Sequence, residues 1–389
     1  MTAVDRIDRT KASPELLWDE FVCQRQPVVV QSFPLDKHWR ANLWTNAYLM
    51  RKAGRSRVSV EYRSSDSEGF GLGKRRTMLF KEFLWRISQG QENLYLTSPE
   101  QPIGPNGFPD VMVPPMLLLE SDIPSRMSWA GNLVPQQINM WMGNSVHGTS
   151  SGLHHDYHDN FYVLLRGRKR FRLFPPSLAE RMYTHGKIVK IHTNGRIVYQ
   201  GQEGIQEDGS HIDDVRIWEE SSSTKEDEII EANSDIQQKE LDKVENPPSF
   251  SMVDLSMSKD SILEKFPGFP YDSCIECTVS AGETLYLPAG WFHEVTSLNG
   301  GEEHGPGHLA INYWLYPPDN LVAGNGGFSQ PYTRAFWNDM WKSGKIRIGK
   351  PQKKSQWTCK KNISKYKQRY GRPWLCYFLK NRKKRKRRG

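Results

Sequence analysis

The sequence predicts a mainly β fold with flanking helices. The 389 residues include 31 Gly, 24 Pro and 13 Trp, a composition that suits a strand-rich fold with many turns better than a helix bundle. Apolar and polar residues alternate in several short segments, as they do in strands with one buried face. The segments with a helical pattern are few, and they flank these strands.

The first hundred residues combine helical and extended patterns. In residues 13–32, Ser13 can cap a helix that has Pro14 at its first position, and a run of valines then predicts a short buried strand. Polar and apolar side chains alternate over residues 57–62, which predicts a second strand. The next expected elements are an amphipathic helix over residues 78–89 and a strand over residues 93–97.

The strongest strand signals come later in the chain. Between residues 136 and 175, apolar side chains alternate with Asn139 and Trp141, and Gly167 is the expected turn between two long strands. The remaining expected elements are a strand–turn–strand unit over residues 277–288, a strand over residues 308–315 and a closing helix over residues 331–341.

Charge is distributed unevenly along the chain. From Lys342 to Gly389 there are 20 Lys and Arg and no acidic residue, which leaves 33 basic against 44 acidic residues in the rest. We therefore expect a folded domain over residues 1–341 and a disordered basic tail over residues 342–389. Residues 203–247 are acidic and poor in aromatic side chains, so we expect a disordered insertion there, with a solvated helix as the alternative.

Two further features limit the class of protein. The chain has no apolar run long enough to span a bilayer, and its first eight residues lack the apolar core of a secretory signal, so we expect no membrane segment. The five cysteines are odd in number, which argues against a disulfide framework. Cys274 and Cys277 form a CxxC pair, for which zinc binding and free thiols both stay open, and free thiols are favoured.

Residues 153–160 contain three His and two Asp, a dense group of metal-binding side chains. On an extended strand, residues two apart face the same side. His154 and Asp156 are therefore expected to point together, while His155 points away. A third ligand must come from elsewhere, and His293 is the best candidate, because a strand end and a Pro-Ala-Gly turn precede it.

Two imidazoles and one carboxylate form the facial triad that suits iron(II) and leaves coordination positions open, whereas a structural zinc site is closed. Taken singly, each feature has a simpler explanation, because His-x-Asp occurs by chance and a histidine after an aromatic pair is more often a packing residue. The joint pattern favours the metal. Lys169 adds to it, because it follows the Gly167 turn and can return beside the metal, although a solvated cation is its simpler interpretation.

Several longer motifs surround these residues. They are His-His-Asp followed by Asn-Phe-Tyr at 160–162, Gly-Arg-Lys at 167–169, Phe-Pro-Pro at 174–176, the run from Ala281 to His293, and Ala-Ile-Asn-Tyr-Trp at 310–314. In these motifs the chain resembles the Jumonji-C (JmjC) family of iron(II)- and 2-oxoglutarate-dependent oxygenases. The resemblance is to its small cupin-like hydroxylase branch, which includes the JmjC lysyl hydroxylases and factor-inhibiting asparaginyl hydroxylase. The basic tail has no counterpart there.

This resemblance implies a double-stranded β-helix, a jelly-roll barrel related to the cupins. It implies that His154, Asp156 and His293 bind iron(II) and that Lys169 binds the distal carboxylate of 2-oxoglutarate. Further residues that match cosubstrate-pocket positions are Ser151, Tyr95, Asn160, Tyr162 and Asn312. The implied reaction consumes O2 and 2-oxoglutarate, releases succinate and carbon dioxide, and hydroxylates a C–H bond of the substrate.

The sequence leaves three function classes open. Protein side-chain hydroxylation is favoured by the motif match. Demethylation of N-methyl-lysine, in histones or other proteins, uses the same chemistry and ranks second. A metal-binding regulator without turnover is disfavoured by the intact triad and Lys169. The acidic body is expected to attract a basic protein or peptide, such as a lysine-rich or histone tail.

The end of the tail, residues 382–388, is seven consecutive cations. Such a block predicts a nuclear localisation signal or a contact to nucleic acid, and the aromatic residues upstream of it can stack on single-stranded bases. A solvated tail is the alternative. We therefore expect a nuclear or cytoplasmic protein. Members of the resembled family often dimerise through C-terminal helices, and only residues 331–341 match such a helix, so the oligomeric state stays open.

Overall fold

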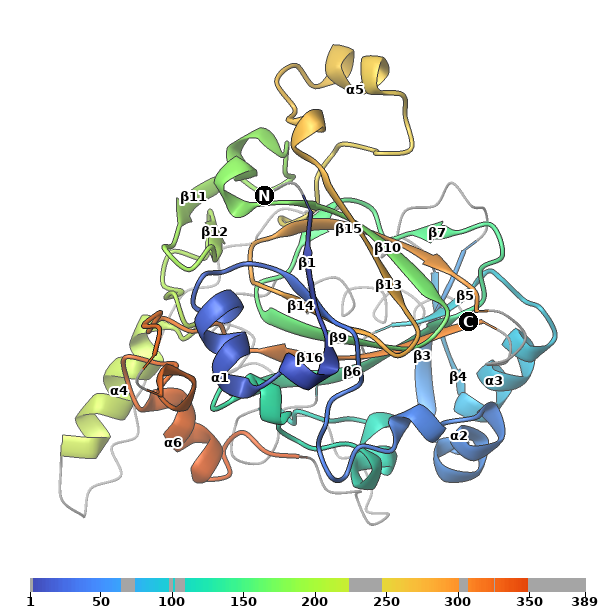
Figure 1. Ribbon diagram of the computed structural model, residues 1–389, viewed down its shortest axis with the longest axis horizontal. Coiled ribbons are helices and arrows are strands. Elements are labelled where there is room, and N and C mark those ends of the chain that lie inside the picture. The colour runs from blue at the N-terminus through green and yellow to red at the C-terminus, as the bar shows by residue number, and fades with distance from the viewer. Residues whose placement is uncertain are drawn as a thin grey trace, which may run out of the picture.

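The computed structural model describes residues 3–63, 74–97, 101, 109–223, 247–300, 307–324 and 326–348. In this part of the chain two β-sheets face each other and helices flank them (Figure 1). The larger sheet has nine strands, in the order β1 (Asp5–Ile7), β2 (Val28–Val30), β14 (Thr284–Leu287), β9 (Asp159–Arg166), β16 (His308–Leu315), β6 (Pro135–Gly143), β5 (Leu94–Leu96), β3 (Arg57–Tyr62) and β4 (Lys74–Leu79).

The smaller sheet faces the middle of the larger one. Its strands are β13 (Ile275–Ser280), β10 (Arg168–Phe174), β15 (Phe292–Leu298) and β7 (Thr149–Ser150), and the short β8 (His154–His155) also pairs with β15. With β14, β9, β16 and β6 of the larger sheet, these strands form the double-stranded β-helix that was expected. A separate hairpin consists of β11 (Ile188–Ile191) and β12 (Ile197–Tyr199).

Alternating side chains explain why the two sheets pack together. On β13, Ile275, Cys277 and Val279 are buried while the residues between them are exposed. These three side chains join one apolar cluster with Leu164 of β9 and Leu285 of β14. Since successive residues of a strand face opposite sides, the same alternation leaves the other face of each strand free for a second layer.

That second layer covers the outer face of the larger sheet. Outward residues such as Val30, Val163 and Ile311 pack in one cluster with Leu17 and Trp18 from the N-terminal helical segment. The helices are α1 (Pro14–Leu17), α2 (Asn46–Ala53), α3 (Phe80–Ser88), α4 (Ile212–Ser223), α5 (Lys259–Lys265) and α6 (Phe336–Lys342). In Figure 1, α2 and α3 lie beside β3 and β4, while α4 and α6 lie together at the opposite side of the barrel.

Most elements predicted from the sequence are confirmed. The Ser13 hydroxyl accepts a hydrogen bond from the Leu16 N–H at 3.2 Å, as a helix cap does. Two boundaries were wrong. Residues 78–79 end β4 rather than begin a helix. The closing helix begins at Phe336 rather than at residue 331, because Tyr332 is buried and Thr333 is held by the Asp319 carboxylate.

The expected acidic insertion differs from the structure in its first half. Residues 203–223 are described, and they end in α4. Asp208 is buried, its carboxylate accepts from the Ser210 N–H at 2.9 Å, and Trp218 packs edge-on against Phe336. The acidic composition predicted disorder, but the Asp208 carboxylate is hydrogen-bonded within its own turn and Trp218 packs the helix against Phe336. Residues 224–246, with the alternative helix, lie outside the described residues.

The basic tail begins as part of the folded body. The Arg347 carbonyl accepts a hydrogen bond from the Val111 N–H at 2.9 Å, and Ile346 is buried. The last described residue is Ile348, so the expectations for the rest of the tail are not addressed by the structure. No helix of the described part has the length and apolar character needed to cross a bilayer.

Candidate metal centre

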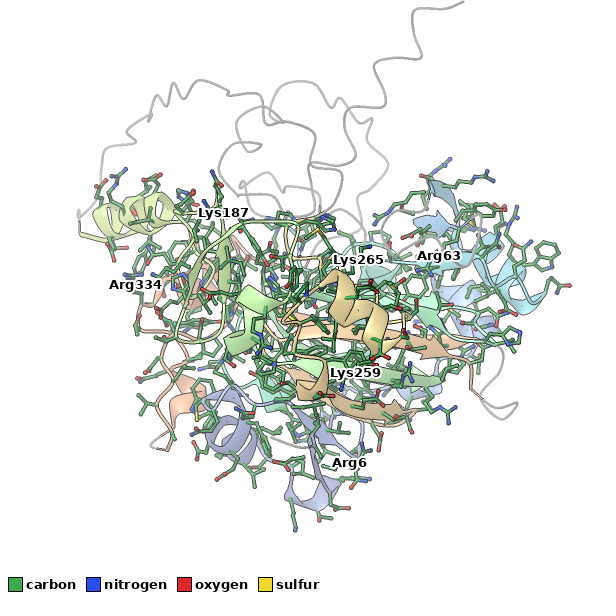
Figure 2. All side chains as sticks on the ribbon, turned by 90° about the horizontal axis from the view of Figure 1, so that it is seen from above. Arg6, Arg63, Lys187, Lys259, Lys265 and Arg334 are labelled. Atoms are coloured by element: carbon green, nitrogen blue, oxygen red, sulfur yellow. The ribbon has the colours of Figure 1, made fainter. Side chains whose placement is uncertain are left out.

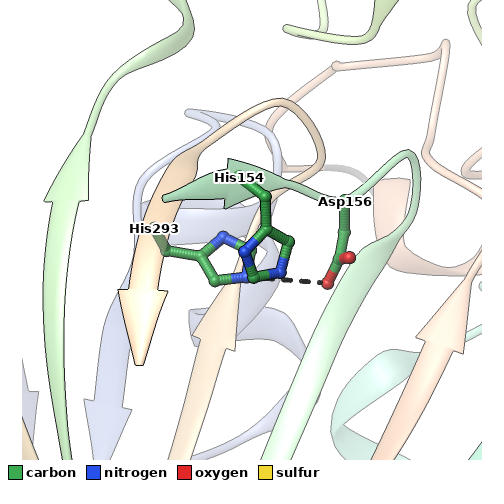
Figure 3. A group of neighbouring side chains, drawn as sticks. All are labelled: His154, Asp156 and His293. Carbon is green, nitrogen blue, oxygen red and sulfur yellow. Dashed lines mark ion pairs between the residues drawn. The ribbon is translucent and has the colours of Figure 1, made fainter. Parts of the chain in front are cut away.

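The three predicted metal ligands meet where β8 pairs with β15. His154 and His293 stand directly opposite each other across this antiparallel pair, and Asp156 follows the end of β8 (Figure 3). One ligand atom from each side chain lies within 4.8 Å of the others. His293 Nε2 lies 3.8 Å from Asp156 Oδ2. The structure therefore brings the three side chains together, and their binding of a metal stays a prediction.

Backbone carbonyls orient both imidazoles. His154 Nδ1 lies 3.0 Å from the Gly152 oxygen, and His293 Nδ1 lies 2.9 Å from the Trp291 oxygen. A carbonyl oxygen only accepts, so each Nδ1 must carry the proton. The lone pair of each ring is then on Nε2, which is the arrangement that fixes metal-binding histidines in known sites.

Electrostatics at the centre favour a bound cation. Burial raises the pKa of Asp156, an effect opposed by His293 and by hydrogen bonds from Trp314 and Asn160. Burial, together with the neighbouring His293, holds the pKa of His154 well below its ordinary value, so this imidazole is neutral. A neutral imidazole and a carboxylate are donors of the kind that a divalent cation needs.

The other histidines of the cluster point elsewhere. His155 Nε2 is 2.8 Å from the Tyr199 hydroxyl, on the far side of β8 from the metal ligands. His158 is enclosed by the rings of Trp314 and Tyr316, and burial lowers its pKa to about 3. As strand alternation predicts, His154 faces Asp156 and His293 while His155 faces away from them.

One side of the triad opens into a pocket. Its walls include Trp141, Phe171, Val295 and Trp314, so the pocket is largely aromatic and apolar, as enzyme pockets commonly are. Two imidazoles and one carboxylate that face such a space fit an open iron(II) site, and a closed structural zinc site would need a further ligand. In the described residues no other cluster of His, Cys, Asp and Glu could hold a metal, and Cys274 and Cys277 are free thiols.

Lys169 lies just behind the pocket wall. It is fully buried, and its amine donates to the Ser297 hydroxyl at 2.5 Å, while His308 Nδ1 is 3.4 Å away. Tyr95 presents its ring to the same amine at 5.7 Å. Burial lowers the pKa of Lys169 to about 7. This buried amine has a hydroxyl and an imidazole as neighbours, and it is suited to bind a carboxylate that enters from the pocket.

The other predicted cosubstrate residues all line this pocket, which the structure shows for Ser151, Tyr95, Asn160, Tyr162 and Asn312. Asn312 accepts from Trp141 Nε1 at 2.9 Å and donates to Asn160 at 3.1 Å. Asn160 in turn bonds to the Asp156 carboxylate. The two asparagines thus connect the aromatic wall to a metal ligand, and their contact with a cosubstrate stays a prediction.

Sequence reasoning missed several residues of the site. Ser297 holds Lys169, and Trp314 donates to Asp156 Oδ2 at 3.2 Å. Both carried a signal. Ser297 is four residues after His293 on β15, and Trp314 is two residues after Asn312 on β16, so each faces the same side as a predicted site residue. Arg63 lines the pocket without any comparable signal in the sequence.

The sequence matches the Cupin-like domain family over residues 14–320. The chain belongs to this family. A protein of Schizosaccharomyces pombe named JmjC domain-containing protein 4 is 30% identical, over 90% of this chain and 91% of its own length. The resemblance to JmjC proteins is thereby confirmed.

More distant relatives carry functional names. The human bifunctional peptidase and (3S)-lysyl hydroxylase JMJD7 is 24% identical over 80% of this chain and 84% of its own length. The lysine-specific demethylase JMJ32 of Arabidopsis thaliana is 25% identical over 80% and 81%. Together with the His-Asp-His triad, this cupin-like JmjC membership supports an iron(II)- and 2-oxoglutarate-dependent oxygenase.

Proposed function

We propose that this cupin-like protein is an iron(II)- and 2-oxoglutarate-dependent dioxygenase that hydroxylates a side chain of a protein substrate. One observation carries the proposal: the triad of His154, Asp156 and His293 shares its pocket with Ser297, and the Ser297 hydroxyl accepts a hydrogen bond from the buried amine of Lys169. A metal site alone would suit many proteins. A cation placed to bind the far end of a dicarboxylate points to the cosubstrate.

The residues divide the work of binding. His154 and His293 would each hold iron(II) through Nε2, and Asp156 through a carboxylate oxygen. Lys169, with Ser297 beside it, would pair with the distal carboxylate of 2-oxoglutarate, because a charge-assisted bond in a dry site is strong. Bound iron(II) supplies the oxidation of a substrate C–H bond that is coupled to decarboxylation of 2-oxoglutarate.

The walls of the pocket keep this chemistry away from water. Trp141 and Trp314 meet edge to face at 5.9 Å, and each is fixed by a hydrogen bond from its ring N–H. Phe171 and Val295 close the opposite side, on the smaller sheet. Rigid apolar walls would exclude solvent from the space beside the triad.

Demethylation of N-methyl-lysine is the second candidate, because one relative is named a lysine-specific demethylase. Both reactions would use the same triad, so geometry does not separate them. Hydroxylation is preferred, because the motif match is to the hydroxylase branch and one relative is named a lysyl hydroxylase. A methylated substrate that releases formaldehyde would identify the demethylase.

The test is an unbiased peptide screen by mass spectrometry with the full chain, iron(II) and 2-oxoglutarate. We expect an unmethylated peptide to gain one oxygen, with succinate formed in equal amount. Controls are the omission of 2-oxoglutarate and the Asp156→Ala variant, which should give neither product. Formaldehyde from methylated peptides would favour demethylation. A metal-loaded protein that never consumes 2-oxoglutarate would contradict both candidates and leave a metal-binding regulator.

The basic tail suggests where the protein acts. We infer from residues 382–388 that it carries a nuclear import signal. A reporter fused to residues 342–389 should accumulate in the nucleus, and one that stays cytoplasmic would end this idea. Binding of single-stranded nucleic acid by the same fusion, weakened by added salt, would point to the other use of the tail.

A further inference from the structure

Arg63 is a charged residue of the pocket that the proposed chemistry does not use. It follows β3, and its backbone N–H donates to the Asn93 oxygen at 3.0 Å. Its side chain is only 9% exposed, and it lines the same pocket as the metal triad. Figure 2 shows Arg63 on the side of the molecule that carries the blue strands β3 and β4.

The guanidinium has more donors than partners among the described residues. Its one hydrogen bond there is long, from Nη2 to the Ser150 oxygen at 3.4 Å. Its Nε is buried without a hydrogen-bond acceptor, and the nearest carboxylate, Glu61, is 4.0 Å from it. A guanidinium has five N–H groups, and leaving buried donors unsatisfied is unfavourable. This side chain is therefore prepared for a ligand that accepts two hydrogen bonds.

Arg63 and Lys169 approach the pocket from different elements. The amine of Lys169, on β10, is fully buried and donates to Ser297. Arg63 follows β3 and donates to the backbone oxygen of Ser150, an exposed residue at the end of β7. Tyr95 lies near both cations, because its ring is 5.7 Å from the Lys169 amine and Arg63 opposes the rise in its pKa that burial causes. A dicarboxylate held by the triad and Lys169 would occupy one of the two cations and leave Arg63 for the substrate.

We propose that Arg63 binds a carboxylate of the polypeptide substrate, an Asp or Glu side chain close in sequence to the residue that reacts. This inference rests on the proposed function. A guanidinium and a carboxylate form two parallel hydrogen bonds, and the neutral amide of Asn or Gln matches this geometry poorly. The acidic body still favours basic proteins in general, and Arg63 adds a local requirement for one acidic residue.

The experiment uses the full chain loaded with Mn(II) and N-oxalylglycine, a non-reacting analogue of 2-oxoglutarate. The probes are N-acetyl-aspartate methylamide and its asparagine counterpart, which differ only in the charged group. Paramagnetic relaxation of the probe protons by Mn(II) reports occupation of the pocket, and Zn(II)-loaded protein is the diamagnetic control. We expect the aspartate probe to bind at least tenfold more tightly than the asparagine probe.

Variants assign the effect to one side chain. Arg63→Gln should abolish the preference for aspartate while N-oxalylglycine affinity stays within twofold. Arg63→Lys keeps the charge but removes the pair of parallel N–H donors, so it should give an intermediate preference for aspartate. Arg57→Gln, an exposed position on β3 outside the pocket, should behave as wild type. If Arg63→Gln does not fold, the wild-type preference and the lysine variant still decide.

Four results would overturn the inference. They are equal binding of both probes by wild type, an unchanged preference in Arg63→Gln, a tenfold loss of N-oxalylglycine affinity in that variant, and inorganic phosphate that displaces the aspartate probe at a tenfold lower concentration. The third would assign Arg63 to the cosubstrate, and the fourth to a phosphorylated or nucleic-acid ligand. Failure of wild type to bind Mn(II) and N-oxalylglycine would instead refute the proposed function itself.

Discussion

Replacement of Lys169 by methionine separates its role in binding from its role in folding. The side chain is fully buried, and its amine has Ser297 and His308 as neighbours rather than a carboxylate. Lys169→Met keeps the length and removes the charge. A hydrogen bond to a charged group contributes about 1.5–3 kcal/mol, so the apparent KM for 2-oxoglutarate should rise roughly 10- to 150-fold.

The same variant should not lose thermal stability. Methionine removes a polar amine from an apolar site, so the melting temperature of the protein without cosubstrate should stay equal or rise. The stabilisation produced by added 2-oxoglutarate should be lost at the same time. Arg170→Met, on the exposed face of β10, is the matched control and should change neither quantity. A variant that melts earlier and binds 2-oxoglutarate normally would refute a cosubstrate role.

The pKa of Lys169 gives the same prediction a pH dependence. Burial lowers this pKa from its ordinary value of 10.5 to about 7. Above pH 7 the unfolded chain holds a proton that the folded protein has released, so stability rises with pH up to 10.5, by at most about 1.4 kcal/mol per pH unit. The affinity for 2-oxoglutarate should fall over the same window, because the charged amine is the binding form. Thermal melts and titrations of wild type and Lys169→Met between pH 6 and 9 test this, and parallel curves would contradict it.

Three further predictions concern the metal ligands and their supports. Asp156→Ala should abolish 2-oxoglutarate turnover and Mn(II) binding in a folded protein, and a variant with undiminished turnover would remove Asp156 from the site. Trp314→Phe deletes the ring N–H that bonds to Asp156, so Mn(II) affinity should drop roughly 10-fold or more while circular dichroism stays unchanged. Asp159→Asn breaks a buried pair with Arg25 and should cost about 3–5 kcal/mol in urea unfolding, and a change below 1 kcal/mol would refute this estimate.

Local alternation of residues along a strand predicted part of the triad. Alternation along a strand selected His154 and rejected His155, and the structure agrees, because His155 bonds to Tyr199 on the other side of the strand. That prediction needed only two neighbouring residues and the geometry of an extended chain. His293 was chosen for the strand end and turn that precede it, and its position opposite His154 was not predicted, since nothing local states which distant strands pair.

Long-range partners account for what the sequence missed. The carboxylate of Asp159 accepts hydrogen bonds from Arg25, Tyr286 and the Ala289 N–H. The Gly290 N–H donates to the backbone carbonyl oxygen of Asp156 at 3.0 Å. This network holds the turn before the third ligand, yet its members come from three separate parts of the chain. The folded helix α4 was missed for a related reason, because the packing of Trp218 against a later helix outweighs an acidic composition.

The pairing of β8 with β15 has a consequence for chain topology. A metal that joins His154 and His293 would close a loop containing everything between them, including α4, α5 and residues 224–246. The entropy of closing a flexible loop grows only with the logarithm of its length, so doubling it costs about 0.6 kcal/mol. The parts of this loop that lie outside the barrel strands can therefore lengthen or shorten in evolution with little effect on metal affinity, which leaves them available as sites for new sequence.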